Sequence, residues 1–204
     1  VEAIRKQLHV FYGDTTQSSD SYMRIINANH FRRVKSYLDN TIKDGGRVVI
    51  GGKMDASKNF IEPTVITDVP LDSDLMQKEI FGPLLPIITY TDLQDALDII
   101  NSKDKPLALY IYSKSKKNID RIIKNTRAGG TCINNSAVHF FNNNLPFGGS
   151  NNSGLGKSHG FFGFQAFSNA RGVFKQNLPP VLEQLMPPYN GLKLKLIDLT
   201  IKWF

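Results

Sequence analysis

Residues 84–134 read LLPIITYTDLQDALDIINSKDKPLALYIYSKSKKNIDRIIKNTRAGGTCIN, a pattern that indicates the fold class. Its three apolar, β-branched runs predict strands, at 84–90, 107–112 and 131–134. The segments between these runs carry apolar residues at helical spacing and predict two helices. Thr91 and Gln94 predict a capping box at the start of the first helix, and Gly129-Gly130 predicts the end of the second. Strands that alternate with helices indicate an α/β fold, in which flanking helices cover a parallel sheet with right-handed crossovers.

The region before this stretch predicts an amphipathic helix and two short strands. Asn27 is a suitable N-cap. The apolar residues that follow it at helical spacing are Phe31, Val34, Tyr37 and Leu38. This helix is expected to end near Gly45-Gly46. The β-branched runs at 48–50 and 63–67 predict the strands. An earlier stripe indicates another helix at the N-terminus, formed by Val1, Ile4, Leu8 and Phe11.

The chain divides into a long α/β region, 1–178, and a tail, 179–204. Pro179-Pro180 and Pro187-Pro188 interrupt any helix and indicate a linker. Residues 191–204 combine Leu and Ile with Lys, and both an amphipathic helix and a strand are consistent with that pattern. Residues 142–163 are rich in Gly, Asn and Ser, so they predict a long loop or several turns, where functional groups tend to lie.

The composition is that of a globular protein with a basic balance. Lys and Arg number 25 against 18 Asp and Glu, a formal net charge of +7. These basic residues are scattered rather than interleaved with aromatics, so nucleic acid is not an expected partner. Cys132 is the only cysteine, which excludes an internal disulfide and fits a reducing compartment. No apolar run reaches the roughly 20 residues of a membrane span. We expect an intracellular protein, cytoplasmic or attached to an intracellular membrane.

The segment Glu79-Ile80-Phe81-Gly82-Pro83 places a carboxylate and an aromatic ring two residues apart. In an extended backbone, residues i and i+2 point to the same side. Glu79 would then accept hydrogen bonds from ribose hydroxyls, and Phe81 would offer a flat surface to a heteroaromatic ring. The alternative is a surface carboxylate beside a core aromatic.

Five blocks in this order resemble the C-terminal part of the aldehyde dehydrogenase superfamily. They are RIINANHFRR (24–33), IEPTV (61–65), MQKEIFGP (76–83), KPLALY (105–110) and LPFGG (145–149). The likeness is greatest to the class 3 or fatty-aldehyde dehydrogenase branch and runs from about Tyr22 to about Gln176. It implies the later part of the family's catalytic domain, with a strand-rich arm at 131–141 and 171–176 that joins two protomers.

The resemblance also implies roles for individual residues. Glu79 would bind the hydroxyls of the nicotinamide ribose of NAD or NADP, and Phe81 would pack against the ribose or the ring. His30 and Arg33 would lie beside the same ribose, although an ordinary partly buried His and a surface Arg are equally consistent. Phe147 would line the aldehyde tunnel, or else serve as a core residue that pins its loop.

Two further motifs suggest other chemistry and are weaker. Cys132 resembles a nucleophile superficially, but the family's nucleophile precedes the Glu-Ile-Phe-Gly-Pro segment, and Cys132 falls in a predicted strand where a cysteine is usually a small buried apolar residue. Gly156-Lys157-Ser158 suggests a phosphate loop, but position 151 is Asn where that motif needs Gly. The histidines have no metal-ligand spacing with Cys, Asp or Glu, so no metal site is predicted.

The resemblance implies NAD(P)-dependent oxidation of an aldehyde, medium- or long-chain or aromatic, to a carboxylic acid. The chain starts at Val1 inside a helix and stops in an apolar run at Trp203-Phe204, so we expect a piece of a larger protein. The nucleophile and the dinucleotide domain would lie upstream, and the chain alone would be inactive. A homodimer is expected, and the tail lysines suggest contact with a membrane surface. The alternatives are a non-catalytic truncated product that serves as a dimerisation module, and a phosphate-binding module.

Overall fold

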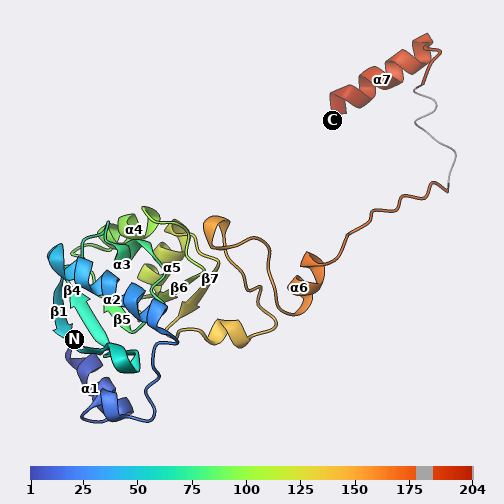
Figure 1. Ribbon diagram of the computed structural model, residues 1–204. Helices are drawn as coiled ribbons and strands as arrows, with labels where there is room; N and C mark the ends of the chain where they lie inside the picture. The colour runs from blue at the N-terminus through green and yellow to red at the C-terminus, as the bar shows by residue number, and fades with distance from the viewer. Residues whose placement is uncertain (178–185, 204) are drawn as a thin grey trace.

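The computed structural model describes residues 1–177 and 186–203 (Figure 1). The helices and strands follow one another as α1 (Glu2–Tyr12), α2 (Ala28–Lys43), β1 (Arg47–Ile50), β2 (Met54–Asp55), β3 (Phe60–Ile61), β4 (Thr64–Thr67), α3 (Asp74–Gln77), β5 (Leu84–Pro86), α4 (Leu93–Asn101), β6 (Ala108–Ile111), α5 (Lys116–Asn125), β7 (Gly130–Ile133), α6 (Gly160–Ala166) and α7 (Gly191–Trp203). The 3₁₀ turns are η1 (Thr16–Ser18), η2 (Ala56–Lys58), η3 (Val138–Phe141) and η4 (Asn151–Ser153). The α/β class predicted from the sequence is confirmed.

Helix α2 organises the first half of the chain. The Asn27 side chain accepts a hydrogen bond from the backbone N–H of His30 at 2.9 Å, which confirms the predicted N-cap. The predicted apolar face is buried as well, at Phe31, Val34, Tyr37 and Leu38. It packs into a core with strand residues that include Ile61, Ile66 and Leu84. The helix ends at Lys43, and the N–H groups of Gly45 and Gly46 donate to carbonyls of its last turn, so it ends near these glycines as predicted.

The central sheet has the order β1-β4-β5. β4 pairs with β5 in parallel, as expected, but β1 pairs with β4 in antiparallel. β5 ends at Pro86, and the predicted strand to Tyr90 is therefore too long. Pro86 has no backbone N–H to donate to a ladder, and Tyr90 is exposed rather than buried.

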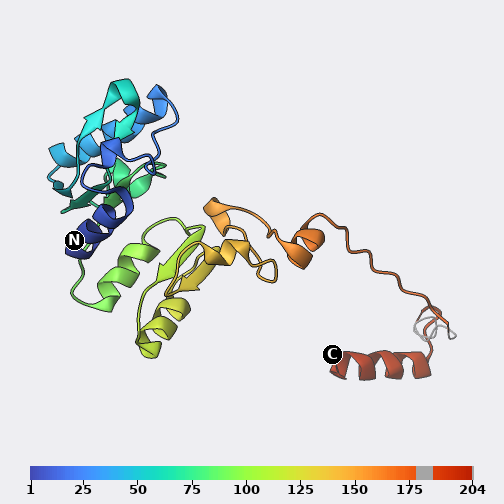
Figure 2. The same cartoon turned by 90° about the horizontal axis from the view of Figure 1, so that it is seen from below.

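The second half contains α4, β6, α5 and β7, which Figure 2 shows as a lobe beside the first half. β6 and β7 are parallel, with Ala108 opposite Gly130 and Ile111 opposite Ile133. β5 and β6 belong to different sheets among the described residues, so the predicted strands do not form one continuous sheet. Parallel pairing across a connecting helix is nevertheless present within this lobe.

The cap of α4 differs from the prediction by one residue. Asp92, not Thr91, is the N-cap, and its partner in the capping box is Asp95, not Gln94. Asp92 accepts from the N–H of Gln94 at 2.8 Å, and Asp95 accepts from the N–H of Asp92 at 3.1 Å. Carboxylates at a helix N-terminus interact with its positive end more strongly than a hydroxyl and an amide do. The end of helix α5 also differs from the prediction: the helix ends at Asn125, four residues before the predicted end at Gly129.

The C-terminal part contains little of the predicted strand-rich arm. β7 overlaps the first part of the predicted 131–141 segment, but 171–177 forms neither helix nor strand. A strand needs a second strand along its edge, and none of the strands β1 to β7 of the described residues pairs with this segment. Residues 142–163 are mostly turns, as predicted, together with η4 and the start of α6. Of the tail, 178–185 lies outside the described residues, which includes the Pro179-Pro180 part of the predicted linker.

The end of the chain is helical, which decides between the helix and the strand that its pattern allowed. α7 spans Gly191–Trp203 and lies away from both lobes in Figures 1 and 2. Leu192, Leu199 and Trp203 share one side at about 100° per residue, but Leu194 and Ile201 lie on the opposite side, so the helix has no single apolar face.

Candidate functional site

The segment with Glu79 and Phe81 runs along α2 with alternate side chains in and out. Ile80 packs against the hydrophobic core, whereas Glu79 and Phe81 are exposed, Phe81 by 72%. The backbone is not extended throughout: Phe81 has φ of +43°, and the predicted geometry is wrong at this residue. A left-handed conformation in a residue other than glycine costs about 1–3 kcal/mol and is typical of functional sites. Among the described residues, the Glu79 carboxylate accepts no hydrogen bond.

Phe81 lines an open hollow of about 410 Å³ with residues from the chain entering α2. The hollow is formed by Arg24, Ile25, Ile26, His30 and Phe81. Its surface is mainly apolar, with Ile26 84% exposed. The structure therefore brings two of the predicted site residues, His30 and Phe81, to one place. His30 is exposed rather than partly buried.

Three lining residues, Arg24, Ile25 and Ile26, were not singled out from the sequence. The Arg24 guanidinium donates to the carbonyl of Tyr22 at 2.7 Å and lies 5.0 Å from the centroid of the Phe60 ring. The backbone N–H of Ile25 donates to the carbonyl of Asn59 at 3.0 Å. These contacts fix the wall of the hollow. The available signal was their place in the 24–33 block that also contains His30.

Arg33 lies beside this segment but faces its backbone. Its Nη1 and Nη2 donate to the carbonyl oxygens of Glu79 and Ile80, at 3.1 and 2.8 Å. Arg33 is partly buried, so it is not an ordinary surface arginine. Glu79, Phe81, His30 and Arg33 thus form one neighbourhood around the start of α2.

Phe147 lies in a different place, inside an aromatic cluster with His139, Phe140 and His159. Its ring stacks on His159 with the centroids 5.3 Å apart, and meets Phe140 edge-on at 5.0 Å. Backbone hydrogen bonds in both directions join Phe147 to Ser158, at 3.2 and 2.7 Å. The residue is partly buried and also lines a cavity of about 580 Å³. It therefore pins its loop and borders a cavity at once.

Lys157 does not act as a phosphate ligand in this arrangement. Its Nζ donates to three carbonyl oxygens: to Gly129 at 3.1 Å, to Gly148 at 2.7 Å and to Gly149 at 3.0 Å. An ammonium has three donors, and all three are used. The phosphate-loop interpretation is therefore wrong, because the cation instead ties the Phe147 loop to the start of β7.

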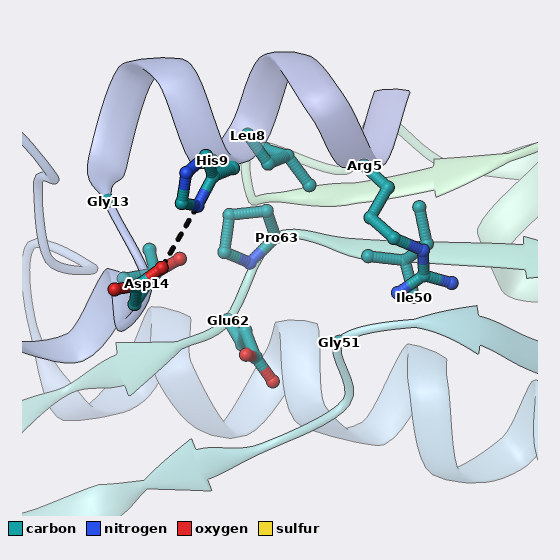
Figure 3. A pocket seen from close by; sticks show the side chains of 10 residues that line it. Arg5, Leu8, His9, Gly13, Asp14, Ile50, Gly51, Glu62 and Pro63 are labelled. Atoms are coloured by element: carbon teal, nitrogen blue, oxygen red, sulfur yellow. Dashed lines mark ion pairs between the residues drawn. The ribbon is translucent and has the colours of Figure 1, made fainter. Parts of the chain in front are cut away.

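A third hollow, of about 260 Å³, lies between α1 and the sheet (Figure 3). Its charged groups have partners within the chain. His9 Nδ1 lies 3.1 Å from Asp14 Oδ1, Arg5 donates to the carbonyl of Val49 at 3.2 Å, and Glu62 accepts from the N–H of Lys53 at 3.2 Å. Each of these side chains thus has a partner within the chain, and we assign no reaction to this hollow.

Cys132 is partly buried on β7, opposite Tyr110, as the predicted strand required. Over residues 1–177 and 186–203, no three His, Cys, Asp or Glu side chains are grouped as metal ligands. Within the same residues, none of the helices has the length and apolar character needed to cross a bilayer.

The structure so far is that of an α/β protein with a solvent-accessible, mainly apolar hollow near the exposed carboxylate of Glu79. The sequence model described as "Aldehyde dehydrogenase family" matches residues 2–173. The chain belongs to the aldehyde dehydrogenase family, which confirms the resemblance found in the sequence.

Its relatives include members of family 3. The chain is 41% identical over 201 residues to aldehyde dehydrogenase family 3 member H1 of Arabidopsis thaliana, covering 98% of this chain and 41% of that protein. It is 43% identical over 171 residues to family 3 member A2 of Rattus norvegicus, covering 84% of this chain and 34% of that protein. The chain thus spans 41% and 34% of the length of these two relatives.

Solved structures agree with this assignment. The substrate-bound state of Staphylococcus aureus AldH matches with a TM-score of 0.84 and 39% identity, over 98% of this chain and 43% of that one. Mycobacterium tuberculosis aldehyde dehydrogenase complexed with NAD+ matches with a TM-score of 0.68 and 30% identity, over 81% of this chain and 35% of that one.

Proposed function

We propose that the protein containing this chain oxidises aldehydes to carboxylic acids with NAD or NADP. The observation that carries the proposal is the free carboxylate of Glu79, two residues from the exposed ring of Phe81 that borders the His30 hollow. Membership of the aldehyde dehydrogenase family supports the reaction type. Similarity to family 3 members supports medium- or long-chain aldehydes, with aromatic aldehydes as the second class.

The residues of the hollow fit the nicotinamide riboside end of the cofactor. A carboxylate with no other partner accepts two ribose hydroxyls, and an exposed aromatic ring covers one face of a flat heterocycle. Ile25 and Ile26 add an apolar wall for that face. The dinucleotide, when bound, supplies the hydride acceptor. The contribution of Glu79 and Phe81 is to hold its reactive ring in one position, which is a proximity effect.

Variants of the whole protein test this assignment. Glu79→Gln keeps the side-chain size and removes the charge, so kcat/KM for NAD(P) should fall about 10- to 100-fold, the value of a charge-assisted hydrogen-bond pair. Glu62→Gln, a carboxylate change outside the hollow, should leave turnover unchanged. The readout is NAD(P)H formation with decanal and with benzaldehyde. Turnover by Glu79→Gln equal to that of the unaltered protein removes Glu79 from the site.

We infer further that the chain by itself has no dehydrogenase activity. Its one cysteine lies partly buried in a β-strand, and no second thiol is available as the nucleophile that aldehyde oxidation through a thioester requires. Purified chain mixed with NAD and decanal should give no NADH. Turnover by the chain that is lost in Cys132→Ala would overturn this inference.

Two partner assignments are also proposals. We propose a homodimer for two reasons. One edge of β7 has no strand beside it among the described residues, and the α6 region exposes three phenylalanine rings, Phe161, Phe164 and Phe167. The mass of the whole protein in solution tests it, and a monomer at micromolar concentration counts against it.

We propose that α7 contacts membrane surfaces. Because α7 has no single apolar face, this contact would depend mainly on the positive charges of Lys193, Lys195 and Lys202, with apolar side chains such as Leu192 and Trp203 exposed on the same helix. The whole protein should sediment with vesicles that contain anionic lipid, and replacing the three lysines by glutamine should abolish sedimentation. Equal sedimentation of both forms would contradict this contact.

A further inference from the structure

Arg33 joins helix α2 to the segment that carries Glu79 and Phe81. Nη1 donates to the carbonyl oxygen of Glu79 at 3.1 Å, and Nη2 donates to that of Ile80 at 2.8 Å. The guanidinium carbon also lies 5.2 Å from the ring centroid of the buried Tyr37. The planar fork and the ring beside it fix the direction of the side chain.

The two carbonyls that Arg33 holds belong to consecutive peptide planes, and each plane moves as a unit. The Ile80 carbonyl shares a peptide plane with the N–H of Phe81. The orientation of this plane relative to Phe81 is set by φ of Phe81, the torsion about the Phe81 N–Cα bond. That φ is +43°, in a region sterically disfavoured for an L residue. The Ile80 side chain is anchored in the core between the two exposed side chains. Without the hydrogen bonds from Arg33, these two peptide planes could rotate, and the side chains of Glu79 and Phe81 would no longer be held in one direction.

We propose that Arg33 is a positioning residue: it orients Glu79 and Phe81 toward the nicotinamide end of the dinucleotide through their backbone, and does not itself bind the dinucleotide. The inference rests on the proposed function of this site. The competing role is a direct contact of Arg33 with the diphosphate. Both terminal nitrogens already donate to these backbone carbonyls, which leaves only the remaining N–H donors of the guanidinium for such a contact.

Kinetics of the whole protein separate these roles. In Arg33→Met, KM for NAD(P) should rise about tenfold or more, while KM for the aldehyde stays within about twofold. The inhibition constant of ADP, which has the diphosphate but no nicotinamide ribose, should also stay within about twofold. Arg33→Lys should resemble Arg33→Met, because an ammonium does not reproduce the planar fork. A parallel rise for ADP and NAD(P), or unchanged kinetics, would overturn the proposal.

Arg32→Met is the matched control. It removes the same charge from the adjacent position of α2, where the guanidinium is exposed and bonds only Asn29 among the described residues. Its kinetics should equal those of the unaltered protein. A loss equal to that in Arg33→Met would assign the effect to the charge of the helix and overturn the positioning role.

A double-mutant cycle tests whether Arg33 acts through its segment. In a Glu79→Ala, Phe81→Ala background, Arg33→Met should change kcat/KM for NAD(P) by less than about twofold, because the groups it orients are gone. A further tenfold loss in that background would show an independent contact and contradict the proposal.

Hydrogen exchange provides a readout that does not depend on the reaction. The backbone amides of residues 79–82 should exchange about tenfold faster or more in Arg33→Met than in the unaltered protein or Arg32→Met. If the whole protein oxidises no aldehyde with NAD(P), the proposed function fails, and exchange still decides whether Arg33 holds the segment. Unchanged exchange in Arg33→Met overturns the positioning role whatever the activity.

Discussion

Gly82 lies so close to Val34 that a Cβ added to the glycine would fall 2.8 Å from both methyl carbons of the valine. Val34 is fully buried on α2. It follows Arg33, whose guanidinium holds the carbonyls of Glu79 and Ile80. Two consecutive residues of one helix thus hold the same segment, one by hydrogen bonds and the other by packing. The close contact is the reason for glycine at position 82.

Gly82→Ala should lower the melting temperature of the protein, at a cost of about 1–3 kcal/mol from the forced contact with Val34. Val34→Ala removes the two methyl groups with which the new Cβ at position 82 would clash. The loss caused by Gly82→Ala should therefore be smaller in a Val34→Ala background, as measured by thermal unfolding of the four proteins. Equal losses in both backgrounds would show that the contact is not what restricts this position.

Lys157→Met should destabilise the protein by about 2 kcal/mol or more, because three carbonyls lose a charged donor in a partly buried place. Lys105→Met is the control: that lysine makes one exposed hydrogen bond, to Asn151 at 2.9 Å, and its loss should cost no more than about 0.5 kcal/mol. Thermal unfolding measures both. Equal stability of the two variants would mean that the Lys157 contacts contribute nothing.

Tyr22 should make stability depend on alkaline pH. Burial raises the pKa of its hydroxyl well above the usual 10.0. Above about pH 10 the unfolded chain therefore releases this proton while the folded chain keeps it. The stability that the group contributes is complete below that pH and is lost as the pH rises toward the folded pKa.

The matching variant is Tyr22→Phe, which loses the 2.7 Å hydrogen bond to the carbonyl of Ile61. At neutral pH it should be about 1 kcal/mol less stable than the unaltered protein. That difference should narrow above pH 10, whereas the exposed Tyr112→Phe should show none at any pH. The measurement is the melting temperature at a series of alkaline pH values. If the unaltered protein and Tyr22→Phe differ by the same amount at every pH, the pKa of Tyr22 is not raised by folding.

Cys132→Ala should leave aldehyde turnover of the whole protein within about twofold, since its thiol lies in a strand interior and takes no part in the proposed reaction. NAD(P)H formation at saturating aldehyde is the measurement. If turnover by Cys132→Ala falls more than about a hundredfold while its melting temperature stays unchanged, Cys132 is the nucleophile and this prediction is wrong.

Local patterns were sufficient for several elements. The Asn27 cap and the stripe from Phe31 to Leu38 predicted α2 and its buried face, because side-chain hydrogen bonds and helical period act over a few residues. The runs that became β6 and β7 were equally clear. The cap of α4 was displaced by one residue because Thr91 and Asp92 are both good caps, and only the folded geometry shows which side chain receives the N–H.

The family, the α/β class and the grouping of residues near α2 could be predicted from the sequence alone. The partners of Arg33 and Lys157 are known only from the folded structure. Their acceptors are backbone carbonyls, which every residue has and which no sequence pattern marks. Arg33 and Ile80 are 47 positions apart, so their contact depends on how the chain packs between them. The left-handed backbone at Phe81 has the same origin, since the contacts made by its neighbours oppose its local preference.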